Sequence, residues 1–194
     1  MNGFGVRLLA MMTMALAALA VGAQTVEVAG AKFEPTAQVG GATLQLNGAG
    51  VRTRVVFKVY AAGLYVPQKS NSVATLLEQK GPRRMTIRML RNVDADTFSG
   101  ALSEGLKNNL SEAQFAGFKA QTDTLIANFK AAGEAKEGDV IFLEFTPDAG
   151  TRVIVNGKAQ GSAIAGEDYF AALLRIWLGD KPADAELKKG LLGG

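Results

Sequence analysis

The sequence NGAGVRTRVVFKVYAAGLYVP, residues 47–67, is the longest stretch of the chain that strongly favours β-structure. Valine, phenylalanine, tyrosine and threonine dominate it, and these side chains fit a pleated, half-buried surface. Successive side chains of a strand point to opposite faces. One face, expected in the core, carries Thr53, Val55, Phe57, Val59 and Ala61. The other carries Arg52, Arg54, Val56, Lys58, Tyr60 and Ala62. We therefore predict one central strand whose cationic face meets either water or a cleft for an anion or an enolate.

The first 23 residues are typical of an export signal. Residues 1–7 contain one basic side chain, and residues 8–21 form an apolar run rich in alanine, methionine and leucine. This run is shorter than the roughly 20 residues that a membrane span needs. Small residues, Val21-Gly22-Ala23, follow at the position of a signal-peptidase site. We predict a signal peptide over residues 1–23 and an exported chain, periplasmic or secreted; an uncleaved anchor is the alternative.

Composition excludes many functions. Residues 24–194 have the length of one domain. The chain has no cysteine, so an exported domain must be stable without disulfides. It has no histidine, which removes Ser-His-Asp catalysis and the usual zinc sites. A net charge of +3 without a dense basic run does not indicate nucleic-acid binding. We expect no metal, no cofactor, no nucleic acid and no stable membrane insertion; the oligomeric state stays open.

The rest of the chain alternates strand and helix patterns. Strands are expected at residues 25–28, 31–33, 43–46, 83–91, 140–145, 152–155 and 158–164. Helices are expected at residues 72–79, 94–109, 111–132, 167–178 and 183–189. Asp94 is a candidate N-cap, Ser111 with Gln114 forms a capping box, and Asn156-Gly157 predicts a hairpin turn. The arginines of residues 83–91 are interpreted as a solvated face; that they join the basic cleft is the alternative. The pattern predicts one α+β domain, a largely antiparallel sheet covered by helices.

Three pieces of the chain together resemble the chalcone isomerase-like superfamily. The first is Gly48-Ala49-Gly50-Val51-Arg52 followed by Tyr60-Ala61-Ala62-Gly63-Leu64-Tyr65. The second is the helical block at residues 94–132, and the third is the segment at residues 169–187. The resemblance covers about residues 24–194 and is most similar to the exported bacterial branch. It implies an open-faced β-sandwich with a cleft between sheet and helices.

The resemblance also implies roles for single residues. Arg52 matches the arginine that pairs with a substrate phenolate or a fatty-acid carboxylate, and Tyr60 falls where the enzymes have a cleft threonine. The enzymes also need a tyrosine and an asparagine on the first helix, where this chain has Phe98 and Gly105. Losing one preorganised donor to a developing enolate typically costs on the order of 10²–10³ in rate.

The sequence leaves three functions open. The first is a non-catalytic binder of a fatty acid or similar amphipathic carboxylate, with ligand-binding residues Arg52, Tyr60, Val56, Phe98, Leu102 and Phe170. The second is an isomerase, an intramolecular lyase, with Arg52 and Tyr60 as catalytic candidates. The third is a structural or partner-binding exported protein.

Overall fold

The stretch at residues 47–67 forms a β-hairpin, and the expectation of a single strand is wrong. In the computed structural model, which describes residues 24–194, strand β4 covers Ala42–Arg54 and strand β5 covers Phe57–Val66. Val55 and Val56 form a two-residue turn between them. Both valines and Phe57 are exposed, because the turn carries them beyond the sheet, whereas Val59 and Ala61 are buried as expected. The turn also brings Arg52 opposite Tyr60 in the register of the two strands.

The sheet confirms the predicted α+β fold with a largely antiparallel sheet. Seven strands follow one another in chain order, from β3 to β9, and each pairs antiparallel with the next. The remaining members are β3 (Thr36–Val39), β6 (Arg83–Met89), β7 (Val140–Thr146), β8 (Gly150–Val155) and β9 (Lys158–Ile164). Two short strands, β1 (Val26–Val28) and β2 (Ala31–Phe33), form a separate sheet. Strand β3 was not expected from the sequence.

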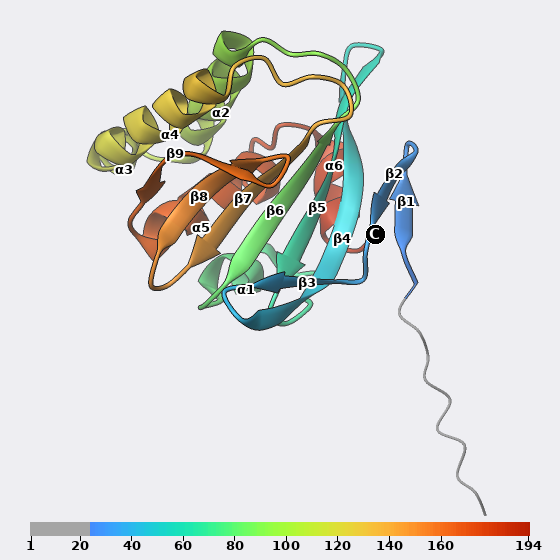
Figure 1. The fold of residues 1–194 in the computed structure, drawn as a ribbon. Coiled ribbons are helices and arrows are strands. Elements are labelled where there is room, and N and C mark those ends of the chain that lie inside the picture. Colours follow the sequence, from blue (N-terminus) through green and yellow to red (C-terminus); the bar gives the residue numbers. More distant parts are fainter. Residues whose placement is uncertain (1–23) are drawn as a thin grey trace, which may run out of the picture.

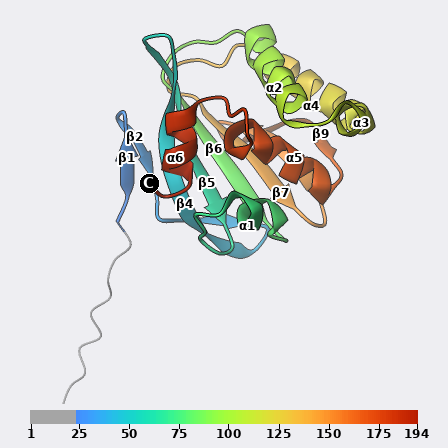
Figure 2. The same cartoon turned by 180° about the vertical axis from the view of Figure 1, so that it is seen from behind.

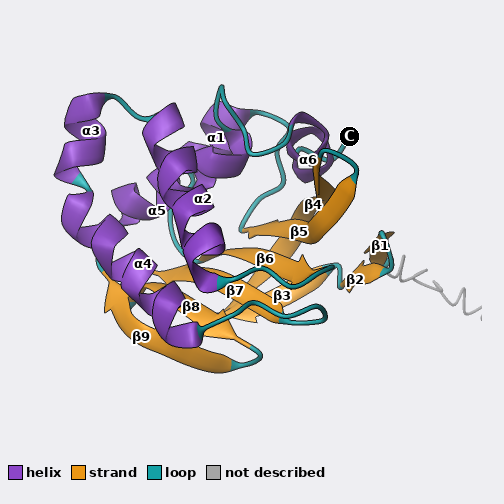
Figure 3. Cartoon of the chain, turned by 90° about the horizontal axis from the view of Figure 1, so that it is seen from above, coloured by secondary structure: helices purple, strands orange, loops and turns teal. Residues whose placement is uncertain are grey.

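Six helices of the described region lie on one side of the curled sheet (Figure 3). They are α1 (Val73–Glu78), α2 (Ala95–Asn109), α3 (Glu112–Gly117), α4 (Lys119–Ala132), α5 (Glu167–Leu178) and α6 (Ala185–Leu191). Seen from behind, α5 and α6 lie across the central strands (Figure 2). None of the helices in residues 24–194 is both long and apolar enough to cross a membrane.

Local signals in the sequence explain where several elements begin. The Asp94 carboxylate accepts a hydrogen bond from the Thr97 N–H at 2.8 Å and caps α2. Ser111 and Gln114 form the expected capping box. The single helix expected at residues 111–132 is instead two helices, because the backbone leaves helical geometry at Phe118, whose ring packs against Tyr169. Asn156 and Gly157 both have positive φ, which confirms the hairpin turn.

The base of the β4–β5 hairpin is packed on both faces. The main core lies between the sheet and the helices, and a smaller one forms on the opposite face around Phe33, Leu44 and Leu46. A Cβ atom at Gly48 would collide with the carbonyl oxygen of Gly190, and one at Gly50 would lie 3.1 Å from Leu187 Cα. These glycines therefore leave room for helix α6 to pack closely against β4.

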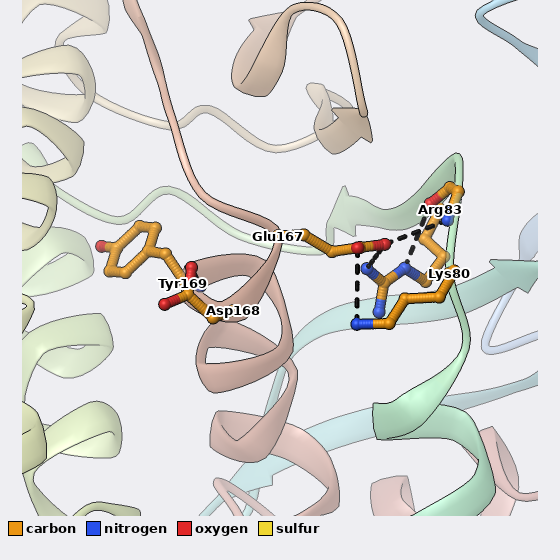
Figure 4. A network of polar contacts seen from close by, with 6 residues as sticks. Lys80, Arg83, Glu167, Asp168 and Tyr169 are labelled. Carbon is orange, nitrogen blue, oxygen red and sulfur yellow. Dashed lines mark hydrogen bonds and ion pairs between the residues drawn. The ribbon is translucent and has the colours of Figure 1, made fainter.

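The arginines at the start of β6 do not form the solvated face that we expected. Arg83 is fully buried, and its Nη2 lies 3.0 Å from Glu167 Oε1 (Figure 4). Its guanidinium carbon also lies 5.4 and 5.3 Å from the ring centroids of Phe145 and Phe170. Burial lowers the pKa of Arg83, and the Glu167 carboxylate opposes that shift. A structural ion pair closes this end of the sheet.

Candidate functional site

A cavity of about 530 Å³ lies between the β4–β5 hairpin and the first turns of α2. Strands β4 and β5 supply one wall, and α2 with the chain that leads into it supplies the other. Its lining combines apolar side chains with cations. The residues that line it are Arg52, Arg54, Val55, Phe57, Val59, Arg91, Asn92, Val93, Asp94, Thr97, Phe98, Ala101 and Glu134. Such a mixture suits a ligand with an apolar body and an anionic end.

Arg52 is a partly buried cation that borders this cavity. Its Nε atom is buried and has no hydrogen-bond partner among residues 24–194, a property that it shares with Arg83 Nη1 and Arg88 Nε, which do not border the cavity. Among the ion pairs of residues 24–194, none involves Arg52. Its guanidinium carbon lies 5.6 Å from the centroid of the Tyr60 ring. Buried polar groups are almost always paired, and leaving a charged one unpaired is costly. The site therefore favours a carboxylate or another anion at Arg52.

The ring of Tyr60 packs against the Arg52 guanidinium, but Tyr60 does not line the cavity. A register shift follows Arg52 and leaves Val59 without a partner on β4, a bulge of the kind that re-aims neighbouring side chains. The Tyr60 hydroxyl is buried and accepts a hydrogen bond from Trp177 Nε1 at 2.8 Å. Burial raises the pKa of Tyr60, with the nearby charge of Arg52 acting in the opposite direction. The phenol is therefore neutral at physiological pH.

The two positions matched to the enzymes' polar residues offer no polar group to a substrate. Phe98 lines the cavity, and its ring lies 5.0 Å from that of Phe129 and 6.5 Å from that of Tyr60. Gly105 faces helix α5, because a Cβ built there would lie 2.8 Å from Ile176 Cγ2. An asparagine at this position would have to displace that buried isoleucine.

The remaining predicted ligand-binding residues lie elsewhere. Val56 is exposed in the hairpin turn and is absent from the cavity lining. Leu102 is buried in the main core. Phe170 is also buried there and stacks on Phe145 with ring centroids 5.5 Å apart. The structure thus brings Arg52 and Phe98 together at the cavity and places Tyr60 behind Arg52, but it does not add Val56, Leu102 or Phe170.

Sequence reasoning missed part of this site. Arg91 lines the cavity, and its guanidinium carbon lies 4.6 Å from the centroid of the Phe57 ring, although we interpreted it as solvated. A second hollow of about 330 Å³ adjoins the first and shares Arg52, Arg54 and Ala101 with it. Only the fold brings residues 52–59 and 91–101 together. Treating Val55-Val56 as a hairpin turn would have placed the first group correctly.

The comparisons with known proteins agree with this architecture. The model of the chalcone isomerase-like family matches residues 23–193, and the chain therefore belongs to that family. It is similar in fold to a crystal structure of a fatty-acid binding protein from Arabidopsis thaliana, with a TM-score of 0.69 and 17% sequence identity. That likeness covers 87% of this chain and 96% of the plant chain. A search of curated proteins gave no match.

Proposed function

We propose that this protein binds a fatty acid or a similar amphipathic carboxylate without transforming it. The carboxylate pairs with Arg52, and the apolar chain lies against Phe98, Val59 and Val93 in the cavity. The observation that carries the proposal is the buried Arg52 Nε, which lacks an acceptor within residues 24–194 and borders the cavity. A planar guanidinium holds a carboxylate through two parallel hydrogen bonds and stays charged when partly buried. The plant structure of similar fold is named a fatty-acid binding protein, which supports the same class of ligand.

Tyr60 acts in this proposal as a positioning residue. Its ring lies under the Arg52 guanidinium, and the bond from Trp177 fixes the hydroxyl. A cation over an aromatic face gains about 0.5–2 kcal/mol, depending on how far it is desolvated. The arginine is thereby held ready before the ligand arrives, which lowers the entropy cost of binding.

The test compares dodecanoic acid with its methyl ester by calorimetry. The ester keeps the apolar chain and removes the charge, so it reports on the cavity without the ion pair. Wild-type protein should bind the acid more tightly than the ester. Charge-assisted hydrogen bonds contribute roughly 1.5–3 kcal/mol each, so Arg52→Ala should weaken acid binding by about tenfold or more and leave ester binding nearly unchanged.

Two variants make the test specific. Arg52→Lys keeps the charge and loses the planar fork, and it should recover only part of the affinity. Arg152→Ala removes an exposed arginine on β8, outside both hollows, and should bind like wild type. Equal acid affinity in wild type and Arg52→Ala, or no binding of acid or ester by wild type, would refute the proposal.

We expect binding without turnover. The cavity presents Phe98 where the enzymes have a phenol, and Gly105 has no side chain and borders the second hollow only with its backbone, since a Cβ there would lie 2.8 Å from Ile176 Cγ2. Chalcone cyclisation by wild-type protein, followed by absorbance, should therefore be undetectable. Robust turnover that Arg52→Ala abolishes would favour the isomerase alternative.

We also propose export with removal of residues 1–23, which lie outside the described residues. The basic start, the short apolar run and the small residues Val21-Gly22-Ala23 support this. The family match begins at residue 23. The mass of the protein recovered from the producing cell should correspond to a chain starting near Gln24. An intact Met1 in a fraction that only detergent extracts would contradict it.

A further inference from the structure

The tip of the β4–β5 hairpin exposes large apolar side chains, a kind of side chain that is mostly buried elsewhere in residues 24–194. Relative exposure is 89% for Val55, 76% for Val56 and 56% for Phe57. Of the exposed large apolar side chains in residues 24–194, the only other is Val26, at 39%. Figure 1 shows the tip projecting from the end of the sheet opposite β3. Three consecutive side chains of this kind at a projecting point indicate an interaction site and not scattered surface apolarity.

Cations surround this tip. Arg54 lies opposite Phe57 in the hairpin, and Lys58 lies opposite Thr53. The Arg91 guanidinium carbon lies 4.6 Å from the centroid of the Phe57 ring. Neither these three cations nor Arg52 takes part in an ion pair within the described part of the chain. Two carboxylates, Asp94 and Glu134, line the neighbouring cavity, and that of Asp94 is engaged as the cap of α2. The tip therefore carries an excess of positive charge.

We infer that the hairpin tip docks on the surface of an anionic lipid bilayer. An apolar point flanked by arginine and lysine inserts its side chains at the boundary between headgroups and acyl chains, and its cations contact the lipid phosphates. The long basic side chains reach the headgroups while their stems lie along the apolar tip. The excess of cations favours an anionic lipid surface over a purely apolar protein groove.

The position of the tip links docking to the cavity. Val55 and Phe57 belong both to the exposed tip and to the cavity lining, together with Arg52, Arg54 and Arg91. A docked tip would therefore place the cavity beside the bilayer, where an amphipathic acid could exchange without crossing water. This link rests on the proposed function, whereas docking itself stands on the tip alone.

The experiment uses protein comprising residues 24–194, which contain both hydrophobic cores, and sedimentation with vesicles. Wild-type protein should bind vesicles of phosphatidylcholine with phosphatidylglycerol and not phosphatidylcholine alone, and added salt should weaken binding. Val56→Ser should reduce the partition coefficient by about tenfold, because the protein loses an apolar side chain that becomes buried in the bilayer on docking. Arg54→Gln with Lys58→Gln should reduce it by roughly twentyfold or more, since each basic side chain near an anionic surface contributes about fivefold.

A tryptophan at the tip reports insertion directly. The emission of Val56→Trp should shift to the blue on adding anionic vesicles, while Val26→Trp, the matched exposed valine outside the tip, should not shift. The native Trp177 is buried and gives a constant background. Absence of wild-type binding to anionic vesicles, equal binding by Val56→Ser, or a shift at Val26→Trp equal to that at Val56→Trp would overturn the inference. Concentration-dependent dimers that Val56→Ser abolishes, without vesicle binding, would assign the tip to a second copy.

The two proposals can fail separately. Val56 does not line the cavity, so Val56→Ser should bind dodecanoic acid like wild type when no vesicles are present. If Val56→Ser no longer binds vesicles but still binds dodecanoic acid, the result supports docking through the hairpin tip. Vesicle binding by a protein that binds no acid would refute the proposed function and leave the docking surface intact.

Discussion

Two arginines of the sheet, Arg83 and Arg52, lie against aromatic rings but have opposite electrostatic surroundings. Arg83 lies 5.4 and 5.3 Å from the rings of Phe145 and Phe170, and Glu167 answers its charge at 3.0 Å. Arg52 lies 5.6 Å from the ring of Tyr60 and takes part in no ion pair within residues 24–194. A buried donor without an acceptor does not separate the two, because Arg83 Nη1 is one as well as Arg52 Nε. At one end of the sheet, the closed end, Arg83 and Glu167 form an internal ion pair. At the other end, the open end, Arg52 borders a cavity and has no acidic partner among residues 24–194.

The difference separates a structural arginine from one available to a ligand. A buried charge that the fold neutralises is part of the folded state, and removing its partner destabilises the protein. A cation with no internal partner contributes little to stability, and its donors can bind an outside anion. Aromatic contacts alone do not distinguish the two. The presence or absence of an acidic partner does.

The largest effect is expected at the closed end. Glu167→Gln removes the charge that answers Arg83 and should lower the free energy of unfolding by about 3 kcal/mol, the low end for a broken buried pair because Glu167 is partly exposed. Arg52→Gln, which removes one positive charge, should cost less than about 1 kcal/mol, since no carboxylate of residues 24–194 forms an ion pair with Arg52. Urea unfolding of both variants measures the contrast. Equal losses would mean that Arg52 is as structural as Arg83.

A pH effect is expected next to this ion pair. Burial raises the pKa of Tyr169 to about 12, against 10.0 for the exposed side chain. The unfolded chain thus releases the phenol proton first, and the contribution of Tyr169 is complete below pH 10 and lost between pH 10 and 12. A shift of this size corresponds to about 2–3 kcal/mol.

Urea unfolding at a series of pH values up to 11.5 checks the Tyr169 prediction. In Tyr169→Phe the decline of stability above pH 10 should be shallower than in wild type. Tyr60 shifts in the same direction, so part of the decline should remain. Identical slopes in wild type and Tyr169→Phe would show that this phenol ionises as readily in the folded state as in the unfolded one.

Tyr60 lies at the cavity end of the sheet, opposite Arg52 in the register of β4 and β5. Tyr60→Phe keeps the ring beneath Arg52 but leaves the Trp177 N–H without its acceptor, which should cost about 1–2 kcal/mol of stability. If the ring alone positions Arg52, acid affinity should fall by less than about threefold. A tenfold loss of acid affinity would instead show that the hydroxyl bonds the ligand directly, as the sequence first indicated. Calorimetry with dodecanoic acid decides between these roles.

The sequence predicted the fold more fully than the site. Periodicity and caps located α2, α5 and the Asn156-Gly157 hairpin, because these signals depend on residues close together in the chain. Arg52 and Phe98 were matched through family resemblance. Val56 was misplaced, because alternation along one assumed strand continued through a two-residue turn without a glycine.

Long-range contacts explain the other differences. Arg83 looked like a solvated residue, and only the packing of α5 brings Glu167 to it. Leu102 and Phe170 are apolar residues at helical spacing, and nothing local distinguishes a cavity-facing one from a core one. The Arg91–Phe57 contact likewise requires the hairpin and β6 to be placed first.

The smallest effect is expected at the hairpin tip, and it should be a gain. Val55 has a φ of 60°, and Val56 at the second turn position is not among the residues with positive φ. A two-residue hairpin turn with positive φ only at its first position favours glycine there. A β-branched residue held in this region is strained by roughly 1–3 kcal/mol.

Val55→Gly should therefore raise the free energy of unfolding by about 1 kcal/mol, the relief of strain being partly offset by the greater freedom of glycine in the unfolded chain. Val56→Gly, one residue along, has no such strain to relieve and should be neutral or slightly destabilising, which makes it the matched control in urea unfolding. The same Val55→Gly protein should bind anionic vesicles less well, because it loses an exposed apolar side chain. If Val55→Gly is more stable than wild type and binds vesicles less well, the valine at the hairpin tip costs stability and contributes to docking. The ion pair of Arg83 and Glu167, by contrast, contributes to stability. Equal stability of Val55→Gly and wild type would remove strain from the description of the tip.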